Sequence, residues 1–225
     1  MNKVKVAAAL LAGTMLVSPA LAADISGYVG ASTDYIWRGE TQSGGDASLS
    51  GGIDVDFGNG FAAGTWVGSL GSSTTTDETT NQVSASDDAN YELNFFGSYS
   101  STIGSVDYEV GYIAYEYPGV ANSDADFADV YVSLGLGPLS VSYYMLASAE
   151  NAATDDNDES YISLDAEFPV LTDWTLGLHY GEQSFDNDSS DEDIAVSLSK
   201  GAMSLTVSGD DGDDTRAIVA WGASF

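Results

Sequence analysis

The feature that most restricts the fold of this chain is a two-residue alternation of apolar and polar side chains along its length. In residues 47–57, Leu49, Ile53 and Val55 alternate with Ser50 and Asp54. Successive side chains of a β-strand point to opposite faces, so this period is typical of a strand with one apolar face. Twelve such strands are predicted, over residues 25–37, 47–57, 61–70, 91–99, 106–117, 130–136, 139–147, 162–168, 174–180, 194–200, 203–208 and 215–225.

The connections between these strands alternate in character. Short turns are predicted at 58–60, 101–104, 137–138, 169–173 and 201–202, and acidic, mostly longer connections such as 71–89 and 182–192 lie between them. This asymmetry is typical of a transmembrane barrel with short periplasmic turns and longer extracellular loops. The sequence therefore predicts a closed antiparallel transmembrane β-barrel of about 12 strands. A soluble, secreted acidic β-sandwich is the alternative, because alternation by itself fits both folds.

The two ends of the chain indicate export. Lys3 and Lys5 precede a short apolar run and an Ala20-Leu21-Ala22 sequence, which is the pattern of a cleaved signal peptide over residues 1–22; a retained N-terminal anchor is the alternative. Residues 23–225 then form a single predicted barrel domain. The final strand ends on Phe225 and resembles the closing strand and assembly signal of bacterial outer-membrane barrels. We therefore expect the outer membrane of a Gram-negative bacterium, with its lipid, lipopolysaccharide and barrel assembly machinery as partners.

The charge of the chain excludes some functions. Beyond the leader, Arg38, Lys200 and Arg216 stand against 35 acidic residues. Nucleic acid is a poor partner, because binding phosphates requires clustered basic side chains. No cysteine is present, which excludes disulfides and thiolate-bound metals. A chain with this excess of negative charge is expected to attract cations.

Acidic residues within the predicted strands follow the polar parity, which faces the lumen of a barrel. Glu116 is the exception, at the loop end of its strand. The residues predicted to line a pore are Asp34, Arg38, Asp54, Asp56, Glu92, Glu109, Asp129, Asp165, His179 and Arg216.

Arg38 and Arg216 are predicted at the loop ends of the first and last strands, which a closed barrel makes neighbours. Two guanidinium groups near Asp34 and Glu40 would form either a constriction with a transverse field or a salt-bridge network that holds the seam. His179 is the single histidine, and no motif places a serine against it, so no catalytic residue and no enzyme activity are predicted.

Three acidic runs are candidates for loose binding of Ca²⁺ or Mg²⁺, which prefer oxygen ligands. Without a complete calcium-binding motif, a solvated surface is the alternative and no cofactor is otherwise expected. The candidate ligands are Asp155, Asp156, Asp158, Asp188, Asp191, Asp211 and Asp213.

Residues 32–42 read Ser-Thr-Asp-Tyr-Ile-Trp-Arg-Gly-Glu-Thr-Gln. With the leader and the chain length, this motif resembles the TorF family of porin-like proteins, small Gram-negative barrels without an established substrate. The resemblance implies an outer-membrane channel and transfers no ligand residues. The predicted function is a porin-like channel for passive diffusion of small polar solutes, with a preference for cations; a non-conducting structural or adhesive barrel is the alternative.

Overall fold

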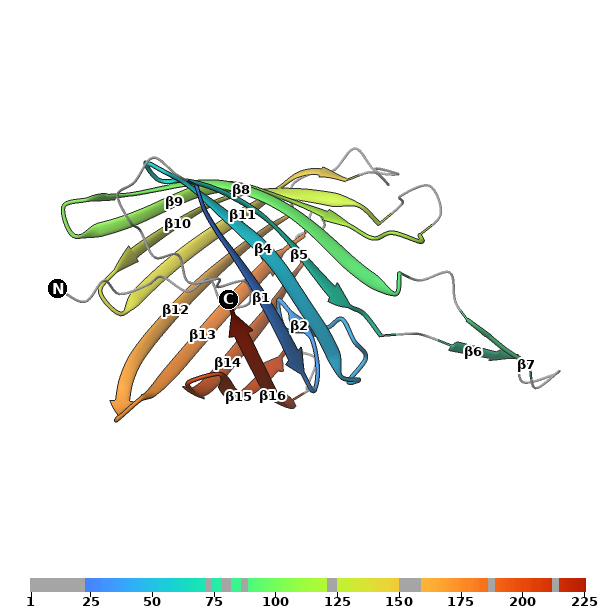
Figure 1. Ribbon diagram of the computed structural model, residues 1–225. Coiled ribbons are helices and arrows are strands. Elements are labelled where there is room, and N and C mark those ends of the chain that lie inside the picture. The colour runs from blue at the N-terminus through green and yellow to red at the C-terminus, as the bar shows by residue number, and fades with distance from the viewer. Residues whose placement is uncertain are drawn as a thin grey trace.

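The structure is a computed structural model that describes residues 23–71, 74–77, 82–85, 89–120, 125–149, 159–185, 189–211 and 215–225. Twelve strands form a closed antiparallel barrel (Figure 1). In chain order they are β1 Asp24–Ser32, β4 Ser48–Gly58, β5 Phe61–Ser69, β8 Tyr91–Ile103, β9 Val106–Glu116, β10 Phe127–Leu136, β11 Leu139–Ala149, β12 Ser160–Leu171, β13 Trp174–Ser184, β14 Ser190–Lys200, β15 Met203–Asp210 and β16 Thr215–Ser224. The predicted all-β barrel is confirmed.

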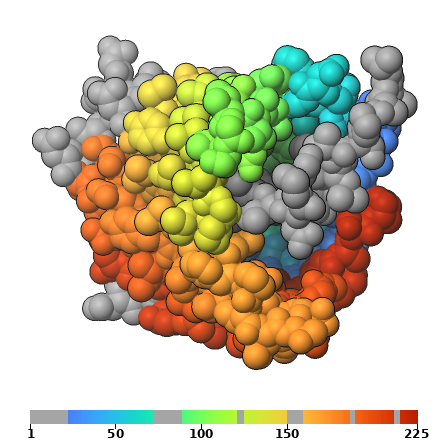
Figure 2. Space-filling view, turned by 90° about the vertical axis from the view of Figure 1, so that its left-hand side faces the viewer, coloured from blue at the N-terminus to red at the C-terminus, as the bar shows by residue number. Residues whose placement is uncertain are grey.

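The barrel closes between its first and last strands. β1 pairs with β4 on one side and with β16 on the other, and the amide of Phe225 donates to the carbonyl of Gly27 at 2.9 Å. Both ends of the described chain therefore lie at the end of the barrel that carries the short turns. Figure 2 views this end and shows the strands enclosing a central hollow.

Each of the five short turns is two residues long, since two residues lie between the end of one strand and the start of the next. Asn59 and Gly60 both have positive φ, 58° and 90°, as the twist of a two-residue hairpin requires. The turns predicted at 101–104 and 169–173 are too long, since β8 extends to Ile103 and β12 to Leu171. β12 accommodates Pro169 with a register irregularity beside it.

The barrel is apolar outside and polar inside. Ile53, Leu164 and Val196 on the outer face are 55%, 54% and 51% exposed. The largest fully buried side chains are Glu92, Asn94, Asp129 and Ser43. A soluble protein buries apolar groups and exposes charges, so this distribution is the reverse of a soluble core. The alternative prediction of a soluble β-sandwich is wrong, because the apolar rows do not meet each other.

Other predicted boundaries also differ from the structure, and two of these differences matter for the lumen. The first strand ends at Ser32, not at residue 37, and the chain then leaves the barrel wall. β13 and β14 extend to Ser184 and from Ser190, which shortens the predicted loop 182–192. A hairpin of β6 (Thr74–Asp77) and β7 (Gln82–Ala85) lies within the predicted loop 71–89 and projects from the barrel (Figure 1). Within the described residues no helix is long and apolar enough to cross a membrane.

Candidate functional site

The connection between β1 and β4 turns into the barrel as a small hairpin. Strands β2 (Ile36–Trp37) and β3 (Glu40–Thr41) pair across a two-residue turn at Arg38 and Gly39, whose φ angles are 48° and 85°. A two-residue turn with positive φ at both positions suits a tight hairpin, and glycine at the second adopts it without strain. We call residues 36–41 the inner hairpin.

The inner hairpin fits closely against the wall. A Cβ atom on Gly39 would lie 2.7 Å from the Cβ of Asp193 on β14, so only glycine permits this approach. Tyr35 and Trp37, which the predicted strand 25–37 included in the barrel wall, lie inside the barrel instead. The ring of Tyr35 packs 5.3 Å from Trp66, which is 6% exposed inside the barrel, and Trp37 packs 5.9 Å from Tyr115.

The base of the inner hairpin is held by a buried carboxylate. Asp34, 5% exposed, accepts hydrogen bonds from Thr41 Oγ1 at 2.6 Å and Ser43 Oγ at 2.8 Å. Its other oxygen lies 3.6 Å from Arg216 Nη1 on β16. The aspartate therefore ties both ends of the hairpin to the last strand of the barrel.

Tyr35 fixes the other side of this base. Its hydroxyl donates to Glu92 Oε2 on β8 at 3.1 Å. Burial and the neighbouring Glu92 carboxylate raise the pKa of Tyr35 well above its ordinary value, so the hydroxyl stays protonated and remains a donor. The connection is thus bonded to strands on both sides of the seam.

Arg38, at the tip of the inner hairpin, reaches a site on the barrel wall built by four strands. Its Nη2 donates to Asp129 Oδ2 on β10 at 2.6 Å, and its Nη1 donates to Gln183 Oε1 on β13 at 3.0 Å. Its guanidinium carbon lies 5.3 Å from the ring centre of Tyr144 on β11 and 4.7 Å from that of Tyr161 on β12. We call Asp129, Tyr144, Tyr161 and Gln183 the Arg38 site.

The strand register places the rings of the Arg38 site in one row. Tyr131, Tyr144 and Tyr161 are direct cross-strand partners on β10, β11 and β12, and Gln183 continues the row on β13. A Cβ on Gly111 would lie 2.4 Å from the ring of Tyr131, so this glycine makes room for the first ring. The strand register and the absence of a side chain at Gly111 together place a row of aromatic rings on the wall that Arg38 contacts.

A cavity of about 450 Å³ lies over the Arg38 site at the end of the barrel with the longer connections. We call it the vestibule. Its lining combines carboxylates with aromatic and aliphatic side chains, and Arg38 is its basic member. The lining residues are Trp37, Arg38, Glu40, Gln42, Ala125, Asp126, Phe127, Asp129, Tyr144, Leu146, Ala149, Glu159, Ser160, Gln183, Phe185, Asp191, Glu192 and Asp210.

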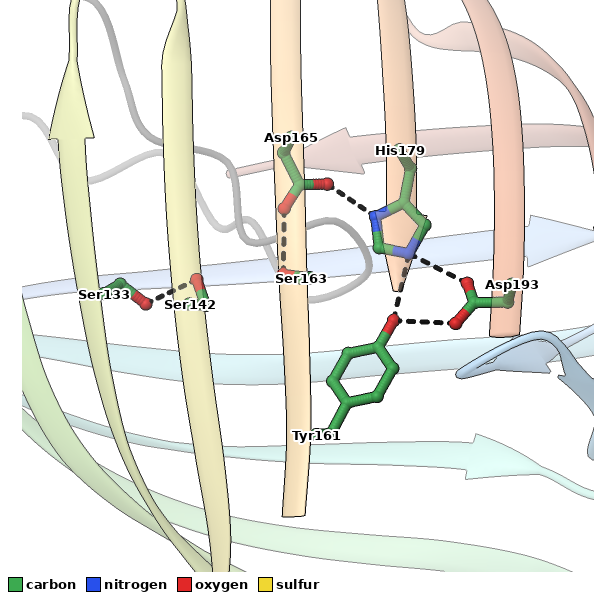
Figure 3. A network of polar contacts seen from close by, with 7 residues as sticks. All are labelled: Ser133, Ser142, Tyr161, Ser163, Asp165, His179 and Asp193. Carbon is green, nitrogen blue, oxygen red and sulfur yellow. Dashed lines mark hydrogen bonds and ion pairs between the residues drawn. The ribbon is translucent and has the colours of Figure 1, made fainter. Parts of the chain in front are cut away.

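His179 lies in a second polar cluster on the same wall (Figure 3). Its Nδ1 is 2.6 Å from Asp165 Oδ1, and its Nε2 is 2.9 Å from Asp193 Oδ1 and 3.0 Å from the hydroxyl of Tyr161. Gly181 leaves the space in which Tyr161 reaches Asp193, because a Cβ there would lie 2.0 Å from the tyrosine oxygen. Tyr161 therefore belongs to both clusters.

This geometry does not form a serine–histidine pair. Ser163 donates to Asp165 Oδ2 at 3.0 Å, and the two ring nitrogens of His179 face carboxylates. An imidazolium can donate to both acids at once, so the arrangement is an ion-paired bridge across β12, β13 and β14. It has the form of a structural network inside the barrel.

Replacing His179 by alanine is expected to lower the free energy of unfolding by about 3 kcal/mol, because it leaves two buried carboxylates without their cation. Unfolding by urea in detergent, followed by tryptophan fluorescence, measures the change. Thr175→Ala, on the same strand, is the control and should change little. Removing both charges as well, with Asp165→Asn and Asp193→Asn, should restore part of the loss; equal stability of wild type and His179→Ala would contradict the bridge.

The structure puts all the predicted pore-lining residues on the inner side of the barrel. Six of them fall into two groups, one around the inner hairpin and one around His179. Glu92 bonds to Tyr35 as above, and Glu109 accepts from Tyr131. Asp54 is 6% exposed, and Asp56 accepts from the amide of Gly58 at 2.7 Å near a short turn.

The prediction that Arg38 and Arg216 lie together at the seam is correct for Arg216 and wrong for Arg38. Arg216 does pair with Asp34 at the seam, as the salt-bridge alternative expected. Arg38 instead crosses the lumen to β10 and β13, because the chain leaves the wall after Ser32. Sequence reasoning also missed Asp193, which is 4% exposed and lies between the predicted loop 182–192 and the predicted strand 194–200. The signal that could have found it is its parity with Ala195 and Ser197, which alternate with the exposed Ile194 and Val196, but the neighbouring acids obscure it.

The predicted cation-binding loops remain a prediction. Asp155, Asp156, Asp158, Asp188 and Asp213 lie outside the described residues. Among the residues that are described, which include Asp191 and Asp211, no group of three or more histidine or acidic side chains is placed to hold a metal ion.

Solved structures with the same fold include outer-membrane porins. "KdgM porin" is 15% identical with a TM-score of 0.57 over 90% of this chain and 99% of that one. "KdgM porin in complex with disordered oligogalacturonate" is 13% identical with a TM-score of 0.55 over the same 90% and 99%. Outer membrane phospholipase A from Escherichia coli is 12% identical with a TM-score of 0.45 over 88% of each chain.

The closed barrel with its inverted polarity therefore has the fold of an outer-membrane porin-like protein. Residues 17–211 match the family described as "Bacterial protein of unknown function (Gcw_chp)", and the chain belongs to this family. No curated protein matches the sequence. The resemblance to TorF proteins is supported as far as the porin-like barrel, and the TorF assignment itself stays a prediction.

Proposed function

We propose that this protein is an outer-membrane channel through which small polar solutes diffuse passively, with a preference for cations. The observation that carries the proposal is the inverted polarity of the barrel. Exposed apolar rows such as Ile53 and Val196 would require hydrocarbon around them, and buried carboxylates such as Glu92 would require a wet interior. The similarity in fold to KdgM porin supports a channel.

The preference for cations follows from the charge of the inner face. Buried carboxylates there include Asp54, Glu92, Asp165 and Asp193. A low-dielectric wall around one sign of charge lowers the entry energy of cations and raises that of anions. The oligogalacturonate named with KdgM is a polyanion, and the acidic wall of this chain argues against a solute of that kind.

The size of the solutes follows from the inner hairpin. It crosses the lumen between the seam and the Arg38 site, so it narrows the passage beneath the vestibule. Twelve strands lie between the packed eight-stranded barrels and the wide sixteen-stranded porins. A barrel of this size with a loop across it suits small ions and small organic solutes.

The partners follow from the same picture and are part of the proposal. Phe225 is 81% exposed at the end of the closing strand, a position in which the barrel assembly machinery can bind it. Outer-membrane lipid and lipopolysaccharide would surround the apolar rows. Acidic loops holding Ca²⁺ or Mg²⁺ would bridge to lipopolysaccharide phosphates.

Planar bilayers test the proposal directly. The purified protein is expected to give single channels whose reversal potential in a KCl gradient favours K⁺ over Cl⁻, because the inner wall is acidic. The inactive control is protein unfolded and added at the same detergent concentration. Channels that prefer Cl⁻ would overturn the cation preference.

A structural barrel without conductance is the second candidate. The specific observation in its favour is that the inner hairpin is bonded on both sides of the lumen, through Asp34 and Arg38. In this case the same bilayers stay silent, and proteoliposomes do not swell in sugars.

A further inference from the structure

The Arg38 site has the chemistry of a receptor for a guanidinium group. Asp129, 2% exposed, supplies a carboxylate at 2.6 Å, and Gln183 supplies an amide oxygen at 3.0 Å. Tyr144 and Tyr161 lie 5.3 and 4.7 Å from the guanidinium carbon. Hydrogen-bond acceptors for separate NH₂ groups together with aromatic rings are the features that favour a planar guanidinium over a compact ammonium.

The guanidinium in the Arg38 site belongs to a loop and not to the wall. All four members of the site stand on barrel strands, whereas Arg38 arrives from the inner hairpin and has a φ of 48°, an uncommon conformation for a residue other than glycine. The hydrogen-bond acceptors and two of the rings that surround the guanidinium are therefore part of the wall, and Trp37, whose ring lies 4.2 Å from it, comes with the hairpin. The loop thus brings its cation to side chains that belong to the barrel strands.

The site is also accessible from the vestibule. Asp129, Tyr144 and Gln183 line this cavity of about 450 Å³ together with Arg38. Around them the vestibule presents further carboxylates and the apolar rings of Trp37 and Phe127. A small organic cation that enters the vestibule thus meets an acidic, partly apolar surface leading to the Arg38 site.

We infer that the Arg38 site is a binding site for small guanidinium-bearing solutes, and that Arg38 is its resident occupant, with which such solutes compete. This inference rests on the proposed function, for which it names the substrate class. When a solute displaces Arg38, the inner hairpin loses its bonds to Asp129 and Gln183 and the passage beneath the vestibule widens. Binding of the solute and release of the hairpin are then one exchange.

Calorimetry with methylguanidinium tests the inference on the purified barrel in detergent. Arg38→Ala empties the site and should bind methylguanidinium about tenfold more tightly than wild type, in which Arg38 competes. The double variant with Asp129→Asn should lose this gain, because the carboxylate that anchors the cation is absent. Methylammonium, which lacks the planar face, should bind Arg38→Ala several-fold more weakly than methylguanidinium.

Equal affinity of wild type, Arg38→Ala and the double variant would overturn the inference, and so would equal affinity for the two cations. Folding is checked by heat-modifiable mobility on gels, and Arg38→Gln, which keeps a polar but shorter and uncharged side chain, is measured in parallel. If neither variant folds, Arg38 is an integral part of the barrel and not a replaceable occupant, which also overturns the inference.

The binding assay separates this inference from the proposed channel. Calorimetry does not require conduction. Binding by Arg38→Ala without current in bilayers would therefore contradict the proposed channel and support the proposed binding site. If the protein forms cation-selective channels but its Arg38→Ala variant does not bind methylguanidinium, the proposed channel is supported and the proposed binding site is contradicted.

Discussion

Replacing residues 36–41 with two glycines is expected to raise the single-channel conductance several-fold. The replacement removes the inner hairpin, including Trp37 and Arg38, from the lumen. It removes Thr41 but keeps the bond from Ser43 to Asp34 at the base. Because the amide of Gln42 already donates to the carbonyl of Tyr35 at 2.7 Å, two glycines complete a tight turn between them. Conductance in KCl across planar bilayers measures the effect.

The matched control shortens a hairpin that lies away from the lumen. β6 and β7 project from the barrel (Figure 1), so replacing residues 74–85 with two glycines should leave the conductance close to that of wild type. If removal of the inner hairpin also leaves the conductance unchanged, the hairpin is not the narrowest part of the passage.

Val196→Arg is expected to prevent stable assembly in a bilayer. Val196 is 51% exposed in the middle of β14, and its cross-strand partners Leu178 and Val207 are also exposed on the outer face. An arginine on the lipid-facing side of a transmembrane barrel costs about 2–4 kcal/mol near the midplane. The fraction of protein with heat-modifiable mobility after refolding into lipid vesicles should fall sharply.

Ser197→Arg places the same side chain one residue further on and serves as the control. Ser197 points inward in a row with Gly177 and Glu167, so the introduced guanidinium can reach a carboxylate across a glycine. This variant should refold like wild type. Equal refolding of both arginine variants would show that the outer face of β14 does not meet hydrocarbon.

The sequence by itself determined the strand pattern, because a strand's two-residue period and its turns are local properties. The turn at Gly137 and Pro138 leaves Leu136 opposite Leu139, and counting back from it pairs Tyr131 with Tyr144, as the structure has them. The same alternation separates the two faces of each strand, whereas the expectation of a closed barrel needed the asymmetry of the connections and the two ends of the chain as well. Several strands, among them β10, β13 and β14, proved longer at one end than the pattern indicated, whereas β1 proved shorter.

Only the tertiary structure decided where the connection after Ser32 goes. Alternation seemed to continue through Trp37, and no local signal separates a strand that continues from a hairpin that turns inward. The direction depends on Asp129 and Gln183, which lie far along the chain and meet Arg38 only when the barrel closes. The lumen of this protein is therefore a product of long-range contacts, whereas its wall is a product of local ones.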